Sequence, residues 1–193
     1  MRDVPSQISG KLRAAADLFA ERGLDQTKID DVAAHTGIPK ATLYYYFTGK
    51  EEILAHLLND ALLSVADEVA IAVQSPGDAA TRLAEVIAAQ LRVMGERPAV
   101  CRALVGDLGR AGRIPAIAEQ IHKSYYAPVD ALLAEGATDG SLIDVPDREA
   151  VAFALFGAVT ISALSFLITH QQLDQDRVAS AVVNTVLSGL RPR

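Results

Sequence analysis

Apolar residues recur along most of the chain at intervals of three or four, which is the period of an amphipathic α-helix. The first run predicts a helix over residues 6–22, and its apolar positions are Ile8, Leu12, Ala15, Ala16 and Phe19. Gly23 is expected to end this helix, and the pattern then predicts two shorter helices, over residues 27–36 and 40–47. The first quarter of the chain therefore reads as three helices.

The two short helices have the features of a rigid helix-turn-helix. Thr27 is a candidate cap for the first of them, because Asp30 follows three residues later as in a capping box. Gly37 allows a tight turn, and Pro39 suits the start of the next helix. Such a frame can hold its second helix out for insertion into the major groove of DNA.

The rest of the chain reads as six longer helices. Proline and glycine residues mark their ends, and the expected ranges are 50–74, 78–95, 98 to 109–112, 115–136 with a break at Pro128, 146–172 and 174–190. We therefore predict an all-α fold of about nine helices. Residues 1–48 are expected to form a three-helix DNA-binding domain, and residues 49–193 a helical domain for ligand binding and dimerisation.

The composition is that of a globular protein without an evident catalytic site. Half of the 193 residues are hydrophobic, 22% are charged, and Cys101 is the only cysteine. A disulfide within the chain and a cysteine-based zinc site are thereby excluded. No catalytic or phosphate-binding motif is present, and the histidines do not combine with acids at metal-ligand spacing. We expect no enzyme activity, no cofactor and no metal, and the absence of a signal-peptide pattern predicts a cytoplasmic protein.

The net charge of −6 is unevenly distributed. Residues 1–50 contain seven Lys/Arg and six Asp/Glu, whereas the remaining residues contain 11 basic and 18 acidic side chains. A near-neutral N-terminal segment can bind DNA if its basic groups share one face, while the acidic remainder disfavours non-specific wrapping of DNA.

Residues 150–169 contain no charged side chain and are long enough to span a bilayer. Acidic flanks and the lack of a Trp or Tyr belt argue against a membrane span, so we favour a helix buried in a core or a subunit interface. We predict that this helix forms a homodimer interface together with residues 174–190. The expected interface residues are Phe153, Ala154, Gly157, Ala158, Ile161, Ser162, Ser165, Val178, Val182 and Val186.

The second helix of the predicted helix-turn-helix carries three successive tyrosines. Leu43 and Phe47 are four residues apart and are expected to point inward together. Tyr44, Tyr45 and Tyr46 then span most of the remaining circumference, so they cannot all be buried. Exposed phenol hydroxyls suit contacts with phosphates and base edges, although packing of Tyr44 on the next helix is an equal alternative.

This N-terminal block resembles the tetracycline-repressor-type (TetR) family of regulators. The resemblance rests on the combination of LFAERG, TKIDDVAAHTGIPKATLYYYF and GKEEIL, over about the first quarter of the chain. It implies an all-α homodimer that binds a palindromic double-stranded DNA operator and is released from it by a small molecule. A ligand-dependent activator is one alternative, and a small all-α binding module or enzyme without a role in DNA binding is another.

The resemblance also implies which residues contact DNA. Lys40, Ala41 and Thr42 match the first turn of the family's recognition helix, and Lys50 matches a phosphate clamp. Two positions depart from the family, because Lys28 replaces the usual Thr or Ser and Tyr46 stands where many members have His. The full expected set is Thr27, Lys28, Lys40, Ala41, Thr42, Tyr44, Tyr45, Tyr46 and Lys50.

The family places its ligand among the helices of the C-terminal domain. Polar groups that could point into an apolar site there are Arg102, Asp107, Gln120, His122, Tyr125 and Tyr126. For any single one of them, a surface or interhelical contact is the favoured interpretation. Because few ionisable residues occur in the middle of these helices, we expect an apolar ligand such as a fatty-acyl or polycyclic compound.

Overall fold

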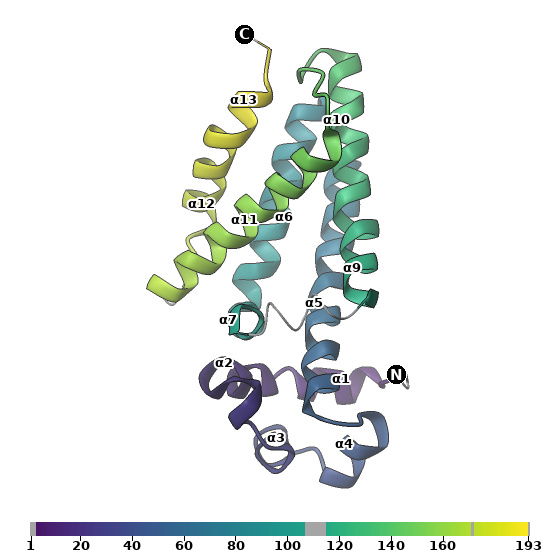
Figure 1. The fold of residues 1–193 in the computed structure, drawn as a ribbon, viewed down its shortest axis with the longest axis vertical. Coiled ribbons are helices and arrows are strands. Elements are labelled where there is room, and N and C mark those ends of the chain that lie inside the picture. The colour runs from purple at the N-terminus through teal and green to yellow at the C-terminus, as the bar shows by residue number, and fades with distance from the viewer. Residues whose placement is uncertain (1–2, 107–114, 171, 193) are drawn as a thin grey trace. The chain divides into compact units, whose positions relative to one another are not determined.

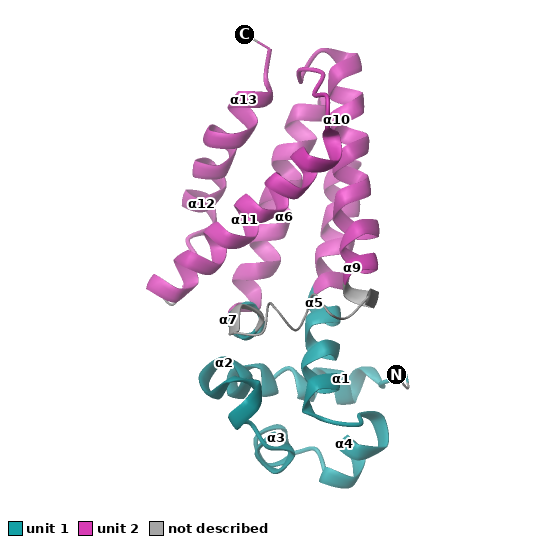
Figure 2. Ribbon diagram, viewed as in Figure 1, with its two compact units in different colours: residues 1–61, 99–115 teal, residues 62–98, 116–193 magenta. Residues whose placement is uncertain are grey.

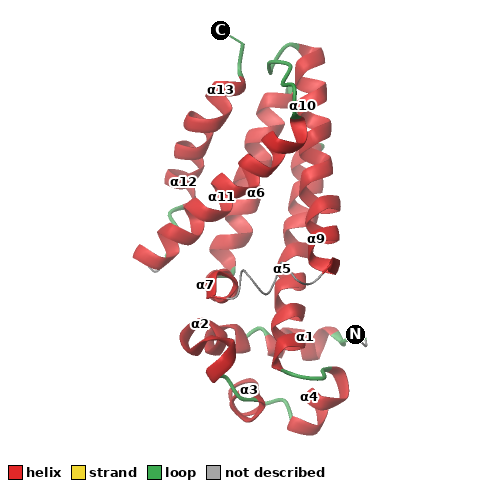
Figure 3. Cartoon of the chain, in the orientation of Figure 1, coloured by secondary structure: helices red, strands yellow, loops and turns green. Residues whose placement is uncertain are grey.

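The computed structural model describes residues 3–106, 115–170 and 172–192 as helices joined by short loops (Figures 1 and 3). No strand occurs in these ranges, and the predicted all-α fold is confirmed. The chain divides into two compact units, residues 1–61 with 99–115 and residues 62–98 with 116–193 (Figure 2). We call them unit 1 and unit 2 and describe each by itself.

Unit 1 is built from short helices around one apolar core. It contains α1 (Ser6–Leu12), α2 (Ala15–Gln26), α3 (Ile29–Thr36), α4 (Lys40–Tyr46), the first half of α5 (Lys50–Val73) and most of α7 (Pro98–Gly106). Its largest fully buried side chains are Leu12, Phe19, Ile38, Leu43, Phe47, Ile53 and Leu57. The apolar positions that predicted the helices therefore form the core that holds them together.

Two boundaries in unit 1 differ from the prediction. The expected helix over residues 6–22 is divided into α1 and α2, although Gly23 ends the regular part of α2 with a φ of 71°. The helix expected to start at Thr27 is capped one residue later, by Lys28. The backbone N–H of Lys28 donates to Asp31 Oδ2 at 3.1 Å, so Asp31 and not Asp30 closes this first turn.

Unit 2 is a bundle in which α6 is central. Its elements are the second half of α5, α6 (Ala79–Glu96), α9 (Pro115–Ile121), the π-helical segment η1 (His122–Tyr126), α10 (Ala127–Asp139), α11 (Arg148–His170), α12 (Gln175–Val182), the π-helical segment η2 (Val183–Leu187) and α13 (Ser188–Leu190). Helices α10, α11 and α12 all pack against α6. Ten side chains of α6 are buried, among them Leu83, Ile87 and Leu91, which makes this helix the core of the unit.

The described residues form ten helices when segments that continue one another are counted together, one more than the nine predicted, because the expected first helix is divided into α1 and α2. The last helix, opened by Asp174 as predicted, passes through α12, η2 and α13 to Leu190. The helix from Pro115 likewise passes through η1 into α10, with Pro128 in the first turn of α10 rather than at a break. The expected end of the helix before Gly109–Gly112 lies outside the described residues.

We had predicted that Gly136 ends a helix, and this prediction is wrong. It is buried inside α10, and a side chain there would collide with Leu142. The helix ends at Gly140, whose φ of 78° is the left-handed conformation that glycine adopts readily. The glycine at 136 therefore serves close packing, a requirement that the local sequence pattern does not distinguish from a stop.

The uncharged segment 150–169 lies within α11, which is by length and hydropathy the one described helix that could cross a membrane. One side of α11 is nevertheless buried within unit 2, through Ala152, Leu155, Val159, Thr160, Ala163, Leu164 and Leu167. A buried stripe of this kind is the pattern of a helix in a globular bundle. The proposed division of the chain between residues 48 and 49 stays a prediction, since α5 contributes to both units.

Candidate nucleic-acid interface

Helix α4 has exposed tyrosines on one side, which we call the tyrosine surface (Tyr44 and Tyr45), and buried apolar side chains on the other. Leu43 and Phe47 are buried as expected, whereas Tyr44 and Tyr45 are 55% and 59% exposed. Tyr46 is half-buried, with its ring 4.9 Å from that of Tyr45 and 6.5 Å from that of Phe47. Tyr44 and Tyr45 are therefore exposed at the surface of unit 1, and Tyr46 packs against Tyr45 and Phe47.

The turn between α3 and α4 is fixed by hydrogen bonds around Gly37. Gly37 has a φ of 66° and a ψ of 18°, a left-handed conformation that favours glycine. The Thr36 hydroxyl donates to the Val32 carbonyl at 2.7 Å, and the Ile38 N–H donates to that hydroxyl at 3.3 Å. Because the Ile38 side chain is also buried, α4 is held in a set orientation against α3.

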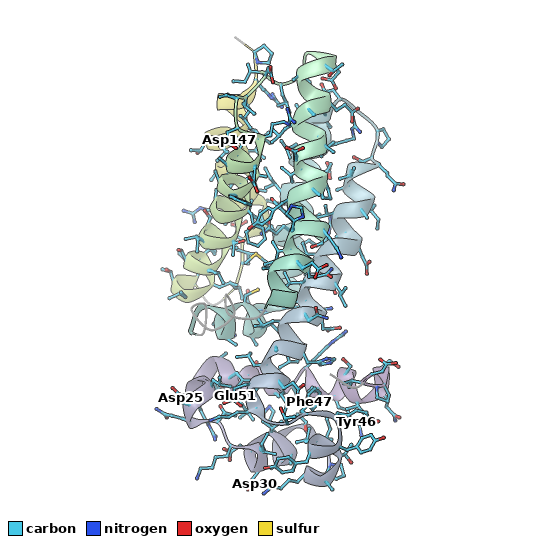
Figure 4. The ribbon with its side chains drawn as sticks, turned by 45° about the vertical axis from the view of Figure 1, so that its right-hand side comes forward. Asp25, Asp30, Tyr46, Phe47, Glu51 and Asp147 are labelled. Atoms are coloured by element: carbon cyan, nitrogen blue, oxygen red, sulfur yellow. The ribbon has the colours of Figure 1, made fainter. Side chains whose placement is uncertain are left out.

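Lys40 begins α4 and carries its positive charge at the surface. Its Nζ lies 2.7 Å from Asp30 Oδ1 and 6.0 Å from the centre of the Tyr44 ring. The hydrogen bond to Asp30 raises the pKa of Lys40, so this group is cationic at neutral pH. Asp30 projects outward at the edge of unit 1 (Figure 4), which places one carboxylate beside the tyrosine surface.

Thr27 does not belong to the exposed surface, and here the structure corrects the expectation. Its side chain is fully buried, and its hydroxyl donates to the Gly23 carbonyl at 2.7 Å. Thr27 therefore stabilises the connection between α2 and α3 through a buried hydrogen bond. The neighbouring Lys28 is exposed, as a DNA contact requires.

Lys50 stands at the first turn of α5 and makes a contact within the protein. Its Nζ donates to the Asp25 carbonyl at 2.9 Å, which ties α5 to the end of α2 (Asp25 is labelled in Figure 4). The adjacent turn is closed by Glu52, whose Oε2 accepts from the Thr48 N–H at 2.6 Å and from its hydroxyl at 2.9 Å. These hydrogen bonds lower the pKa of Glu52, so the carboxylate is charged close to Lys50.

A pair of polar contacts between α1 and α5 was not foreseen from the sequence. Ser9 Oγ and His56 Nε2 are hydrogen-bonded at 2.8 Å, and Arg13 Nε donates to Asp60 Oδ2 at 3.1 Å. The His56 ring lies 5.6 Å from that of Phe47. Burial lowers the pKa of His56, against an opposing influence of Asp60. The spacing of Ile53, His56 and Asp60 along one face of α5 was the available signal.

Unit 1 thus brings most of the predicted DNA-contacting residues onto neighbouring elements. Helices α3 and α4 pack together, and α4 displays Lys40, Ala41, Tyr44 and Tyr45 as exposed residues, with Thr42 half-buried. Primary amines, phenol hydroxyls and a small side chain next to each other are suited to phosphate and base-edge contacts.

The ligand-site candidates are only partly brought together. Tyr125 is buried and Tyr126 half-buried, and their rings meet those of Phe153 and Phe156 on α11. His122 is exposed and Gln120 half-buried nearby, whereas Arg102 belongs to unit 1 and Asp107 lies outside the described residues. The sequence reasoning missed Gln90, a buried residue on α6 whose amide donates to Thr160 Oγ1 at 2.8 Å.

The dimer candidates divide between a surface and a core. On α11, Phe153, Ala154, Ile161, Ser162 and Ser165 are exposed, and Gly157 and Ala158 are half-buried. Val178 and Val182 are instead buried within unit 2, where α12 packs against α6, and Val186 is half-buried. The placement of Val178 and Val182 at an interface was therefore wrong, because their apolar stripe serves the core of the unit itself.

No group of three or more metal-ligating side chains is found among the described residues. The described part of the chain likewise has no buried Asp, Glu, Lys, Arg or His side chain.

The segment that contains the three tyrosines of α4 matches a family of known proteins. Residues 12–57 match the model of the bacterial regulatory proteins of the tetR family. The chain is 22% identical over 178 residues to the fatty acid metabolism regulator protein of Bacillus subtilis (strain 168). The aligned residues cover 92% of each of the two proteins.

Solved structures show the same fold over nearly the whole chain. The ketosteroid transcriptional regulator KstR2 of Mycobacterium tuberculosis superposes with a TM-score of 0.80 at 23% identity, covering 99% of this chain and 98% of that one. The transcriptional regulator FadR from Bacillus subtilis, solved in complex with stearoyl-CoA, gives a TM-score of 0.77 at 22% identity, covering 94% and 98%. The similarity therefore extends beyond the N-terminal domain to the helical unit that follows it.

Proposed function

Because this chain belongs to the tetR family of bacterial regulatory proteins, we propose that it is a homodimeric transcriptional repressor. In this proposal it binds a palindromic operator in the cytoplasm and leaves the DNA when a small, largely apolar ligand binds to unit 2. Its full-length relatives and structural neighbours are transcriptional regulators rather than enzymes. The observation that carries the DNA-binding role is the exposure of Tyr44 and Tyr45 beside Lys40, on a helix fixed by buried Leu43 and Phe47.

We assign base reading to the first turn of α4 and phosphate contacts to its flanks. Lys40 and Thr42 can donate hydrogen bonds to base edges, and Ala41 can approach a thymine methyl group. Tyr44 and Tyr45, with Lys28 and Lys50, are proposed to contact phosphates and so to set the position of α4 on the duplex. Lys50 would do so from the N-terminus of α5, where backbone N–H groups also favour an anion.

The proposed ligand class rests on the names of the relatives and on the character of unit 2. One relative regulates fatty acid metabolism, one structural neighbour is a ketosteroid regulator, and another was solved with stearoyl-CoA. The absence of buried charged side chains from the described part of unit 2 agrees with a fatty-acyl or polycyclic ligand. A ligand-dependent activator would share the fold, and operator affinity measured with and without ligand separates the two modes.

The DNA-binding proposal is tested by titrating the protein onto a palindromic duplex from the region upstream of its own gene, followed by fluorescence anisotropy. We expect the double variant Tyr44→Ala/Tyr45→Ala to lose operator affinity by about 1.5–3 kcal/mol for each hydrogen bond to a charged phosphate that is removed. The matched control is Lys123→Ala, which removes an exposed cation from unit 2 and should leave the affinity unchanged. Unchanged binding by the tyrosine variant, with its circular dichroism spectrum preserved, would refute the assignment of α4.

A further inference from the structure

Among the described residues, three buried side-chain polar atoms have no hydrogen-bond partner: Arg82 Nε, Gln90 Oε1 and the Tyr125 hydroxyl oxygen. The Arg82 guanidinium is paired with Glu135 through another nitrogen, which leaves Gln90 and Tyr125. Gln90 on α6 is 2% exposed and Tyr125 in η1 is 1% exposed. The Gln90 amide nitrogen is used by Thr160, but its Oε1 is unpartnered, and so is the Tyr125 hydroxyl. Buried polar groups are nearly always hydrogen-bonded, since an unmet group costs its full desolvation. No described residue supplies a partner for these two atoms, so both can accept one from a bound ligand.

The two side chains approach neighbouring positions on one helix. The Tyr125 ring lies edge-on to Phe156 of α11, with 5.0 Å between ring centres. Gln90 donates to Thr160, which is four residues beyond Phe156 and therefore one turn along the same face of α11. An oxygen acceptor from α6 and a hydroxyl from η1 thus flank adjacent turns of a single helix.

Aromatic rings cluster around Tyr125. Tyr126 contacts the rings of Phe153 and Phe156 at 4.6 and 5.5 Å between centres, and it contacts Tyr125 at 6.1 Å. All of these contacts are edge-to-face. Rings in this arrangement form an apolar wall suited to a hydrocarbon chain or a fused ring system.

The backbone that carries Tyr125 is unusual. Residues His122–Tyr126 form a π-helical segment between α9 and α10. Such segments are rare, and they occur frequently at functional sites. This feature is independent of the unpartnered atoms, and it marks the same residue.

The chemistry of the site favours an uncharged polar group. The buried polar side chains of the described residues are Thr27, Thr36, Gln90, Ser124 and Thr160, so an ionised head group would meet no buried counter-ion among them. Burial raises the pKa of Tyr125, which keeps its phenol protonated and able to donate. Gln90 Oε1 can only accept, and a hydroxyl group can both accept from Tyr125 and donate to Gln90.

We propose that Tyr125 and Gln90 bind the uncharged oxygen function of a long-chain lipid, a hydroxyl or an acyl carbonyl, whose hydrocarbon part packs against the aromatic wall. This inference rests on the proposed function and gives its effector a site and a chemical class. A hydroxyl engages both side chains, whereas an acyl carbonyl engages Tyr125 alone.

The test compares three probes of equal acyl or alkyl chain length on the protein: dodecanol, methyl dodecanoate and dodecanoate. Affinities are measured without DNA by displacement of a fluorescent lipid at a pH where dodecanoate is ionised. We expect dodecanol or methyl dodecanoate to bind at least about tenfold more tightly than dodecanoate, since a charged head meets no buried counter-ion among the described residues. The arm that binds more tightly identifies the oxygen function.

The key variant is Tyr125→Phe, and Ser124→Ala is its matched control. We expect Tyr125→Phe to weaken the tighter probe about tenfold while leaving resistance to urea unchanged or higher, because it removes an unpartnered hydroxyl. Ser124→Ala removes a hydroxyl of the same segment that donates to the Gln120 carbonyl at 2.7 Å and is not assigned to the site, so it should bind within about twofold of the wild type. Tightest binding by dodecanoate, equal affinity of wild type and Tyr125→Phe, or no binding of any probe to the wild type would overturn the proposal.

Operator-release measurements separate this inference from the proposed function. If the probes release operator equally from wild type and Tyr125→Phe, the site is wrong and ligand-controlled repression stands. If probe binding depends on Tyr125 but has no effect on operator affinity, the site stands and the release mechanism is wrong.

Discussion

Asp30 is an acidic residue on a surface that we assign to DNA, and its contact with Lys40 gives it a defined effect. The carboxylate lies 2.7 Å from the Lys40 ammonium, so a phosphate must compete with it for that cation. Both side chains are exposed, and their pairing is therefore weak and sensitive to salt. Asp30 should thus reduce non-specific attraction to DNA without preventing specific binding.

We expect Asp30→Asn to bind a non-palindromic duplex several-fold more tightly than the wild type at low salt, because one repulsive charge is lost and Lys40 is freed. The gain should shrink as salt is raised, as counter-ion release becomes less favourable. Anisotropy titrations over a salt series measure both effects. Asp144→Asn, which removes an exposed carboxylate from unit 2, is the charge-matched control. An affinity of Asp30→Asn equal to that of the control would contradict this view of Asp30.

At the scale of elements, α1 is fastened to α5 by a contact that responds to pH. Burial lowers the pKa of His56 below its ordinary value of 6.5, while its Nε2 is hydrogen-bonded to Ser9 and the Asp60 carboxylate lies near. The unfolded chain therefore binds a proton on this histidine more readily than the folded chain does. Stability from the neutral imidazole is present above about pH 6.5 and is lost as the pH falls through the lower folded pKa.

We expect the free energy of unfolding of the wild type to decline between about pH 7 and pH 5, and His56→Gln to flatten part of that decline. Urea unfolding at a series of pH values gives the measurement. His35→Gln serves as the control, since His35 is exposed on α3 and its replacement should not alter the slope. If His56→Gln keeps the full slope, another group is responsible.

The elements themselves were largely predictable because they depend on local signals. Leu43 and Phe47 were expected to be buried from their spacing alone, and Asp174 was expected to start the last helix from its capping chemistry. Gly136 was misplaced because a glycine that admits Leu142 looks the same in sequence as a glycine that ends a helix. The local sequence pattern indicates where a helix can end, but it does not indicate which distant residues pack against the helix.

The site residues divide in the same way. The exposure of Tyr44 and Tyr45 followed from helix geometry, whereas the burial of Thr27 depends on a hydrogen bond to a carbonyl four residues earlier. Gln90 and Thr160 are 70 residues apart in sequence, and nothing in either segment alone indicates that they meet. Long-range polar pairs of this kind become visible only when the fold brings their elements together.

At the scale of the whole molecule, α11 has one apolar side that is buried within unit 2 and a second apolar side that is exposed. Residues such as Leu155, Val159 and Ala163 are buried within unit 2, while Phe153, Ile161 and Ile168 are substantially exposed on the same helix. An apolar face that extends beyond what the unit itself covers is the usual mark of an interaction surface. In our proposal a second copy of the chain covers it, since reading a palindrome requires two recognition helices.

We expect Ile161→Glu to shift the protein towards monomer, because Ile161 is 53% exposed in the centre of this face and a carboxylate there would be buried without a partner. Light scattering coupled to gel filtration gives the mass, and operator titration should show a large loss of affinity because each monomer then binds only one half-site. Ile71→Glu is the matched control, since Ile71 on α5 is 68% exposed and lies outside the proposed interface. A dimer that survives Ile161→Glu at low micromolar concentration would place the interface elsewhere. Dissociation of both variants alike would show that charge, and not the α11 face, is responsible.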